Sequence, residues 1–491
     1  MLRQLPFLVS FLVLSCTMAV AQDLSSDLRG GVSFSDEDTL SAVANSAESP
    51  DNSAGNGAGS DTAAADAAIN AAIAEDDSTG LGTAGRVVPA RPFADRIAAV
   101  RGVQSASGAV QDDGVFGGDT NFDQASGLRL GRFTILPEIT ITGGWTDNTA
   151  QTQSGTSGQL YRISPNITAT SNWSRHQLDF ALRGTYVGYP DQRSDDNPSL
   201  TASTALRLDL NSLTTVNGSA AYTYSREDNS SAESSGGNDD VHQLSTSLGV
   251  TRDAGLVGVT LRGALDRNIY TAGDAGTPSS ARDNTLYSVN LRLDTNTGAT
   301  FSPFTEGSLL VRRYDNSCSD ALCEDRNANG YQLRGGVAIA TGSKLSGEVG
   351  AGWRIEDLED ERLENLQGLI VDASLVWSPT RLTTITGGLG TSFEATDIDG
   401  ASGSIIYSGD LRLAHEFSDR IVGETGIGYS YRTYQGASIE EETLTGLVGL
   451  TYALTQNIAL QTRYNYRKFT GSDEVSDYSQ NSIEAGLRFR H

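Results

Sequence analysis

The sequence predicts an all-β protein: a transmembrane antiparallel up-and-down β-barrel of about eighteen strands, preceded by a disordered N-terminal tail. Three observations predict this fold. Apolar and polar residues alternate with a period of two from residue 128 onward, short and long connections alternate between the candidate strands, and aromatic residues gather at strand ends. The alternation occupies so much of the chain that no second layer remains to cover the apolar face, whereas lipid covers that face in a membrane barrel.

The composition agrees with such a barrel. Hydrophobic residues make up only 38% of the 491 residues and Gly occurs 54 times, which lumen-facing and loop positions explain. The formal net charge of -26 argues against a nucleic-acid partner, because nucleic-acid binding needs a basic surface.

Residues 1–21 have the pattern of a secretory signal peptide. Arg3 precedes an apolar run from Leu5 to Leu14, and Ala19-Val20-Ala21 forms the cleavage pattern. Cys16 offers a lipidation site as the alternative, but the preceding Val-Leu-Ser fits a lipobox poorly. No later stretch approaches the roughly 18 consecutive apolar residues of a membrane helix, so insertion must use strands.

Residues 22–127 are predicted to form a disordered periplasmic tail. The part from 22 to 85 is rich in Ala, Ser, Asp and Gly and has hardly an aromatic residue, so it cannot bury enough apolar surface to offset the entropy of ordering. A transient helix is expected at 63–75. A short amphipathic helix near 93–101 is interpreted either as a docking peptide or plug, or as a loosely held linker.

The barrel is predicted to span 128–491. Its first strand, 133–145, places Ile139, Ile141 and Trp145 outward and Glu138, Thr140 and Thr142 inward. In its last strand Ile483, Ala485, Leu487 and Phe489 share one face, and Glu484, Gly486, Arg488 and Arg490 share the other.

The connections are of two kinds. The tight ones are expected at Ser174-Arg175, Ala254-Gly255, Gly342-Ser343, Pro379-Thr380, Ser418-Asp419 and Thr455-Gln456. The long ones are expected at 147–158, 191–199, 227–240, 272–283, 315–329, 357–364, 396–403, 436–442 and 471–480. Short turns on one side and long loops on the other are typical of bacterial outer-membrane barrels, whose short turns are periplasmic. An even strand number then places both barrel ends at the periplasm.

Aromatic residues at strand ends predict two interfacial girdles. One group, Trp173 and Trp377, lies beside tight turns. The other lies toward the long loops and comprises Trp145, Trp353, Tyr186, Tyr270, Tyr431 and Tyr466.

The opening of the barrel resembles a known family. Gly131, Phe133, Ile135 and Pro137 form a G-x-F-x-(L/I)-x-P start, and Asp147-Asn148 follows the first strand. This pattern resembles the putative beta-barrel porin type 2 family of Gram-negative outer-membrane proteins. The resemblance implies an outer-membrane location, and some members are thought to accompany exopolysaccharide secretion, which implies periplasmic polysaccharide-export components as partners. Barrel insertion machinery and lipopolysaccharide are further expected partners, although the terminal aromatic signal is displaced, since Phe489 is followed by two residues.

Strand parity places a set of charged residues on the inner face, as candidate pore-lining residues. They are Arg183, Arg207, Arg262, Arg292, Arg334, Arg354, Arg412, Arg432, Arg463 and Arg488, with Asp209, Asp266, Asp294 and Asp410 near them on the same face. One interpretation is that they form ion pairs that stiffen the wall. The other is an arginine-rich lining that favours anionic or sugar solutes.

No cofactor or metal is predicted. Cys318 and Cys323 share one loop, and in an exported protein they predict a local disulfide rather than a metal site, because no His lies nearby. The acidic runs 356–362 and 440–442 are interpreted as solvated loops, with binding of divalent cations or lipopolysaccharide as the alternative. The run 397–400 is too short for a calcium loop.

The predicted function is passage of small hydrophilic solutes through an outer-membrane channel. A conduit for exopolysaccharide and a structural or receptor barrel without conductance are the alternatives. A hydrolase would need a serine activated by a held histidine. No such context surrounds His176, His415, His491, or His242 near Ser245. No enzymatic activity is therefore predicted.

Overall fold

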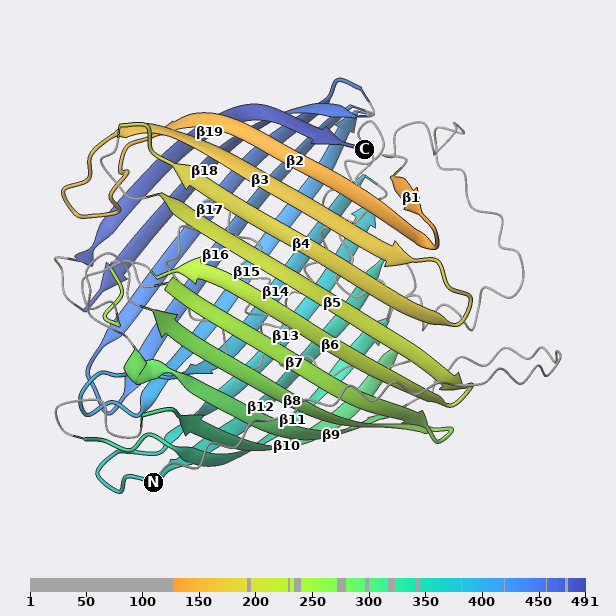
Figure 1. Ribbon diagram of the computed structural model, residues 1–491, viewed down its shortest axis with the longest axis vertical. Helices are drawn as coiled ribbons and strands as arrows, with labels where there is room; N and C mark the ends of the chain where they lie inside the picture. Colours follow the sequence, from red (N-terminus) through yellow and green to blue (C-terminus); the bar gives the residue numbers. More distant parts are fainter. Residues whose placement is uncertain are drawn as a thin grey trace, which may run out of the picture.

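The computed structural model describes residues 127–491, except 192–195, 228–229, 234–239, 272–279, 296–299, 317–322, 341–343, 381, 419, 456 and 473–475. The predictions for the signal peptide, the tail and its two short helices therefore lie outside the described residues. Throughout the described part, the chain folds into one antiparallel sheet that curves round and closes on itself (Figure 1).

Each strand pairs with its neighbours along the chain, and β19 pairs with β2, so that β2 to β19 form a closed barrel of eighteen strands. This confirms the predicted fold class. The strands are β1 (Leu128–Leu130), β2 (Phe133–Thr146), β3 (Gly158–Ser171), β4 (His176–Gly188), β5 (Asn197–Asn211), β6 (Thr214–Arg226), β7 (Asp240–Asp253), β8 (Val257–Thr271), β9 (Asn284–Thr295), β10 (Phe301–Tyr314), β11 (Ala328–Ala340), β12 (Leu345–Leu358), β13 (Leu366–Thr380), β14 (Thr383–Glu394), β15 (Gly403–Ser418), β16 (Ile421–Gln435), β17 (Glu440–Ala453), β18 (Ile458–Gly471) and β19 (Tyr478–Arg490), with a 3-10 turn η1 (Ser280–Arg282) between β8 and β9.

The short strand β1 lies at the rim of the barrel. It folds back on β2 and pairs with Phe133 to Ile135, just beyond the point where β19 stops pairing at Glu138. Backbone groups of β2 that β19 does not reach are thereby hydrogen-bonded. In Figure 1 β1 lies beside the C-terminal end of the chain.

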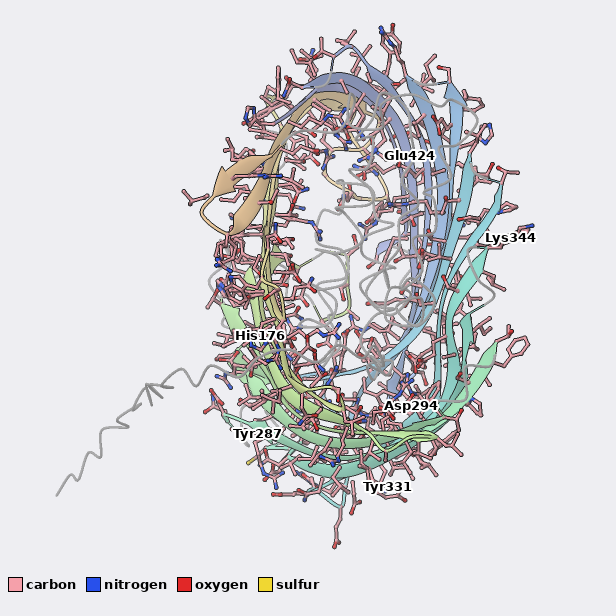
Figure 2. The ribbon with its side chains drawn as sticks, turned by 90° about the vertical axis from the view of Figure 1, so that its right-hand side faces the viewer. His176, Tyr287, Asp294, Tyr331, Lys344 and Glu424 are labelled. Atoms are coloured by element: carbon pink, nitrogen blue, oxygen red, sulfur yellow. The ribbon has the colours of Figure 1, made fainter. Side chains whose placement is uncertain are left out.

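The two faces of the wall have opposite character. In β2, Ile139, Ile141 and Trp145 are exposed on the outside, whereas Thr140 and Thr142 are buried on the inside, as predicted. Figure 2 shows the same division, with Tyr287 and Tyr331 pointing away from the barrel and Asp294 and Glu424 pointing into it. The outer face is thus suited to contact lipid, and the polar groups of the inner face line the lumen. Within the described ranges, no helix is long and apolar enough to cross a membrane.

The connections divide by length between the two ends of the barrel. At one end the turns range from 212–213 to 296–300, and at the other the loops reach lengths such as 227–239 and 315–327. The predicted positions agree to within three residues at each end. The turn placed at Pro379-Thr380 lies at 381–382, and the loop placed at 436–442 is only 436–439. Glu440 to Glu442 belong to β17, where Glu441 lies opposite Arg432 of β16, so this acidic run is part of the wall.

The predicted girdles are only partly correct. Trp145, Trp353 and Trp377 have exposed side chains on the outside of the barrel. Phe133 and Trp173 pack edge to face near the short turns, with ring centroids 5.9 Å apart. Tyr270, however, is buried on the inner face with Arg282 4.1 Å above its ring. Tyr270 has the same parity as Asp266 and Asn268, and parity, not position along the strand, decides which way a side chain points.

Candidate channel lining and constriction

All of the predicted lining residues lie on strands with inward parity. Eight of them are buried: Arg262, Arg292, Arg334, Arg354, Arg432, Asp266, Asp294 and Asp410. The half-buried ones are Arg183, Arg207, Arg412, Arg463, Arg488 and Asp209. Two of the expected same-strand pairs are formed: Arg207 lies 3.1 Å from Asp209, and Arg292 lies 2.9 Å from Asp294.

The densest charge cluster lines the wall from β9 to β13. Glu306 of β10 lies opposite Arg292 of β9 on one side and Arg334 of β11 on the other. Arg334 also contacts Asp372 at 2.9 Å, and Arg292 contacts Glu348 at 2.7 Å. Opposite charges on neighbouring strands thus alternate from β9 to β12, and β13 adds a further carboxylate. These glutamates are not among the predicted lining residues, because the predicted partners lie on the same strand as each arginine; period-two parity and cross-strand register are the signals that point to them.

Aromatic rings support the guanidinium groups of this cluster. The Phe304 ring lies 3.8 Å from the guanidinium carbon of Arg292 and 5.3 Å from that of Arg334. Because guanidinium groups stack favourably on aromatic faces, Phe304 holds both side chains flat against the wall. Inward aromatic residues therefore help to position the arginines of these ion pairs.

Further ion pairs connect other parts of the wall. Arg312 and Arg354 both bind Glu356, at 2.9 and 2.6 Å, which places Glu356 inside the wall although the sequence assigned it to a solvated loop. Arg162 of β3 binds Glu484 of β19 through two hydrogen bonds of 3.0 and 2.9 Å. The Arg162–Glu484 ion pair spans β2, which lies between β3 and β19, and so holds the closing strands together.

A short segment of the β6–β7 loop, Ser230–Glu233, reaches across the lumen. The Ala232 N–H donates a 2.6 Å hydrogen bond to Glu441 of β17, and the Ser231 hydroxyl donates to the same carboxylate at 3.3 Å. Ser230 donates to the carbonyl of Gln151 in the β2–β3 loop. Eight strands lie between β7 and β16 in either direction around the ring, so contacts between this loop and β16–β17 must cross the lumen.

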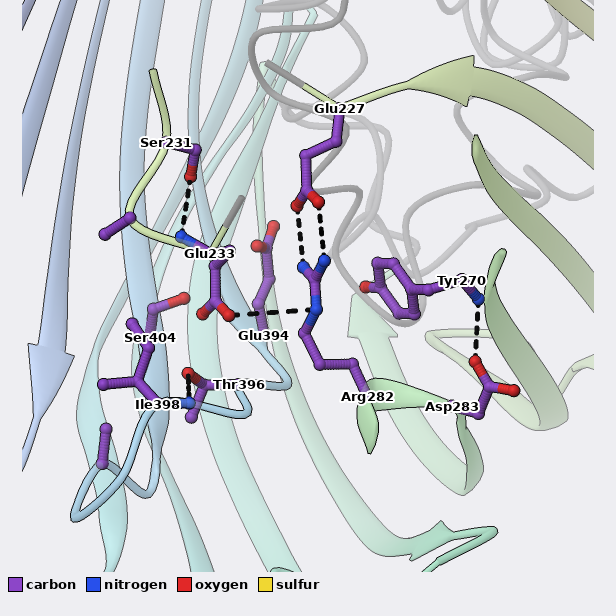
Figure 3. A network of polar contacts seen from close by, with 12 residues as sticks. Glu227, Ser231, Glu233, Tyr270, Arg282, Asp283, Glu394, Thr396, Ile398 and Ser404 are labelled. Atoms are coloured by element: carbon purple, nitrogen blue, oxygen red, sulfur yellow. Dashed lines mark hydrogen bonds and ion pairs between the residues drawn. The ribbon is translucent and has the colours of Figure 1, made fainter. Parts of the chain in front are cut away.

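Two arginines lie near Glu233 of this segment, as Figure 3 shows for Arg282. Arg282 of η1 donates two hydrogen bonds of 2.7 and 2.6 Å to Glu227, and its Nε lies 3.9 Å from Glu233. Arg432 lies 2.7 Å from Glu394, 3.7 Å from Glu441 and 4.0 Å from Glu233. The lumen is thus narrowed near the long-loop end by a polar segment that is hydrogen-bonded to Gln151 and to Glu441.

Of the residues in this constriction, only Arg432 is among the predicted lining residues. Glu227, Glu233 and Arg282 lie in loops, where no periodicity tells which way a side chain points. Glu441 could have been found, because it shares inward parity with the buried Thr443 of the same strand.

His242, Ser245 and Cys323 lie among the described residues. His242 faces outward, where its Nδ1 lies 2.8 Å from the Tyr222 hydroxyl, while Ser245 is buried on the inner face, so the two cannot form a catalytic pair. Across the residues with described positions, no group of three or more His, Cys, Asp or Glu side chains is arranged to hold a metal ion. The predicted Cys318–Cys323 disulfide stays a prediction, because Cys318 lies outside the described residues.

Comparisons with known proteins bear on the whole barrel. A family model described as "Putative beta-barrel porin 2" matches residues 122–491. No curated protein matches the sequence. Among solved structures, the chain is similar to the siderophore receptor PirA from Pseudomonas aeruginosa, with 8% identity, 73% of this chain and 80% of that chain covered, and a TM-score of 0.33. It is also similar to the copper transporter OprC, with 9% identity, 74% and 81% coverage and a TM-score of 0.41. Structural similarity this distant carries no information about function.

Proposed function

Because the chain belongs to the family described as Putative beta-barrel porin 2, we propose that it is an outer-membrane channel for small hydrophilic solutes. The observation that carries the proposal is the segment Ser230–Glu233, which is bound to Glu441 on the opposite wall. A barrel of eighteen strands is wide enough for an aqueous channel. A polar segment across such a lumen provides the constriction that a selective channel needs.

The favoured solutes are polar and uncharged, with sugars as the main class. Many of the inward arginines are bound to carboxylates; Arg292 and Arg334, for example, share Glu306. A bound pair presents a dipole rather than a net charge, which weakens the field that would select anions. Solutes rich in hydroxyl groups can exchange hydrogen bonds with both members of such pairs.

The proposed channel has a defined orientation in the outer membrane. We place the tail 22–127 in the periplasm, because β2 begins at the end of the barrel that carries the short turns. Lipid and lipopolysaccharide would surround the outer face, and insertion machinery would act on the unassembled chain. We propose no chemical reaction for this protein. A local disulfide between Cys318 and Cys323 would brace the β10–β11 loop.

Single-channel conductance of the full mature chain in planar bilayers tests the proposal. Replacement of Glu441 by Ala removes the acceptor of two hydrogen bonds that dock the segment. Because hydrogen bonds to charged groups contribute about 1.5–3 kcal/mol, the ratio of undocked to docked segment should rise about tenfold or more. We therefore expect larger or more frequent openings in Glu441→Ala than in the unmodified chain.

Glu442→Ala is the matched control. It removes the same charge from the same strand, but Glu442 is exposed and has the opposite parity. Its conductance should equal that of the unmodified chain. If folded barrels of the unmodified chain and of Glu441→Ala both fail to conduct, the channel proposal is wrong, and an export conduit or a structural or receptor barrel remains.

A further inference from the structure

Glu233 is a buried carboxylate whose ion pairs are both long. Glu233 is only 2% exposed, and the Thr396 side chain is within hydrogen-bonding reach of its carboxylate. The nearest cationic groups are Arg282 Nε at 3.9 Å and Arg432 Nη2 at 4.0 Å. Both contacts are at the outer limit of an ion pair.

The two arginines are already engaged by other carboxylates. Glu227 binds Arg282 at 2.6 Å, and Glu394 binds Arg432 at 2.7 Å with Glu441 at 3.7 Å. Two guanidinium groups therefore serve four carboxylates, and Glu233 has the longest contacts of the four. The ionisable groups around Glu233 are Glu227, Tyr270 of β8, Arg282 of η1, Tyr314 of β10, Glu394 of β14, Asp397 of the β14–β15 loop, Arg432 and Tyr434 of β16, and Glu441 of β17.

An ionised carboxylate in this position is unfavourable, because a buried charge needs a close counter-charge and both arginines bind other carboxylates more closely. Burial raises the pKa of Glu233 to about 8, although Arg282 and Arg432 act in the opposite direction and Asp397 adds to the rise. At neutral pH the docked segment therefore carries a protonated Glu233.

We propose that Glu233 is the proton sensor of a gate formed by Ser230–Glu233: the neutral carboxyl keeps the segment docked across the lumen, and loss of the proton releases it. This inference rests on the proposed channel function. The geometry supports it in two ways. Ser231 and Ala232 dock the segment on Glu441 of the opposite wall, and Glu233 beside them makes the longest contacts of the four carboxylates that share Arg282 and Arg432.

The direction of the pH dependence follows from the two states. In the docked segment the pKa is about 8, and in an undocked, solvated segment it would return to about 4.3. The docked state binds the proton more tightly, so docking strengthens as pH falls and weakens by up to about tenfold per pH unit as pH rises between these values. Above pH 8 the effect levels off. The channel should thus close in mildly acidic medium and open in alkaline medium.

Conductance of the full chain measured from pH 5 to pH 9 tests the inference. For the unmodified protein we expect open probability to rise severalfold or more toward pH 9. In Glu233→Gln the neutral amide imitates the protonated carboxyl, so open probability should stay at the low, acid-like level throughout. Glu233→Ala, which also cannot ionise, should show a flat pH profile as well and replaces the amide variant if that variant does not fold.

Asp360→Asn is the control for removal of a loop carboxylate at the same end of the barrel. Arg362 binds Asp360 and lowers its pKa, so Asp360 does not titrate in this range, and its variant should keep the pH dependence of the unmodified chain. Retention of that dependence in Glu233→Gln would overturn the inference, as would a flat profile in an unmodified protein that conducts. In the latter case the channel proposal survives if Glu441→Ala still increases conductance.

Discussion

Individual arginines in the wall differ in how much the fold depends on them. Arg334 is 1% exposed and contacts Glu306, Glu348 and Asp372 at 3.1, 3.7 and 2.9 Å. Arg313 contacts Glu359 at 3.6 Å, but both side chains are about two-fifths exposed. Removing one partner from a buried network leaves charges without compensation, whereas water replaces the partner at an exposed site.

Replacement of Arg334 by Met should therefore lower the free energy of unfolding by about 3–5 kcal/mol. Arg313→Met should lower it by less than about 1 kcal/mol. Guanidinium unfolding in detergent micelles, followed by tryptophan fluorescence, measures both. Equal losses in the two variants would mean that the buried ion pairs contribute no more than exposed ones.

Each strand has one face toward lipid and the other toward the aqueous lumen. In β16, Ile427 and Tyr429 have exposed side chains on the outer face, while Arg432 is buried inside. Ile427 lies near the middle of the strand, and Thr433, which has the same parity, lies near its long-loop end. The cost of placing a charge on the outer face should depend on depth, because the middle of the strand faces the hydrocarbon core and its ends face the headgroups.

Ile427→Arg should consequently destabilise the barrel in lipid vesicles by about 2–4 kcal/mol, and Thr433→Arg by about 0–1 kcal/mol. Urea titration of the two variants in the same vesicles provides the comparison. A larger loss for Thr433→Arg would show that the membrane does not lie where the strand pattern places it.

The same elements show what could be predicted from the sequence. Alternation identified the strands and the faces of residues such as Ile139 and Arg334, because a strand leaves each side chain only two directions. Tyr270 was assigned wrongly when its position along the strand was used in place of parity. Arg282 and Glu233 could not be predicted, because their positions depend on loops that fold against distant strands.

Strand pairing was equally hard to predict in detail. The partners of Arg334 come from three other strands, β10, β12 and β13. Their approach depends on the register of each hairpin, and turns misplaced by one or two residues, such as the one at 381–382, alter it.

At the scale of the whole molecule, the barrel depends on one pairing between strands that are far apart in the sequence. β19 lies against β2, and the backbones approach so closely that a Cβ at Gly486 would lie 2.0 Å from the carbonyl oxygen of Ile141. Arg162 and Thr142 both bind Glu484 across the same seam. A glycine is required at 486 because any side chain would push the two closing strands apart.

Gly486→Val should therefore prevent closure and abolish the difference in gel mobility between heated and unheated protein that marks a closed barrel. Gly249→Val is the control, since Gly249 also has inward parity and its Cβ would meet its nearest neighbour at an ordinary 3.5 Å. A heat-modifiable, fully stable Gly486→Val protein would contradict this account of the seam.

The order in which β2 to β19 pair has a consequence for how the molecule is assembled. Every other pairing joins strands that follow one another, so the sheet can grow hairpin by hairpin as the chain is delivered. Until the last step, the outer edges of β2 and β19 present unpaired N–H and C=O groups, each of which costs several kcal/mol in hydrocarbon. The growing sheet must therefore keep these two edges shielded from lipid until they meet, which makes insertion and closure a single event.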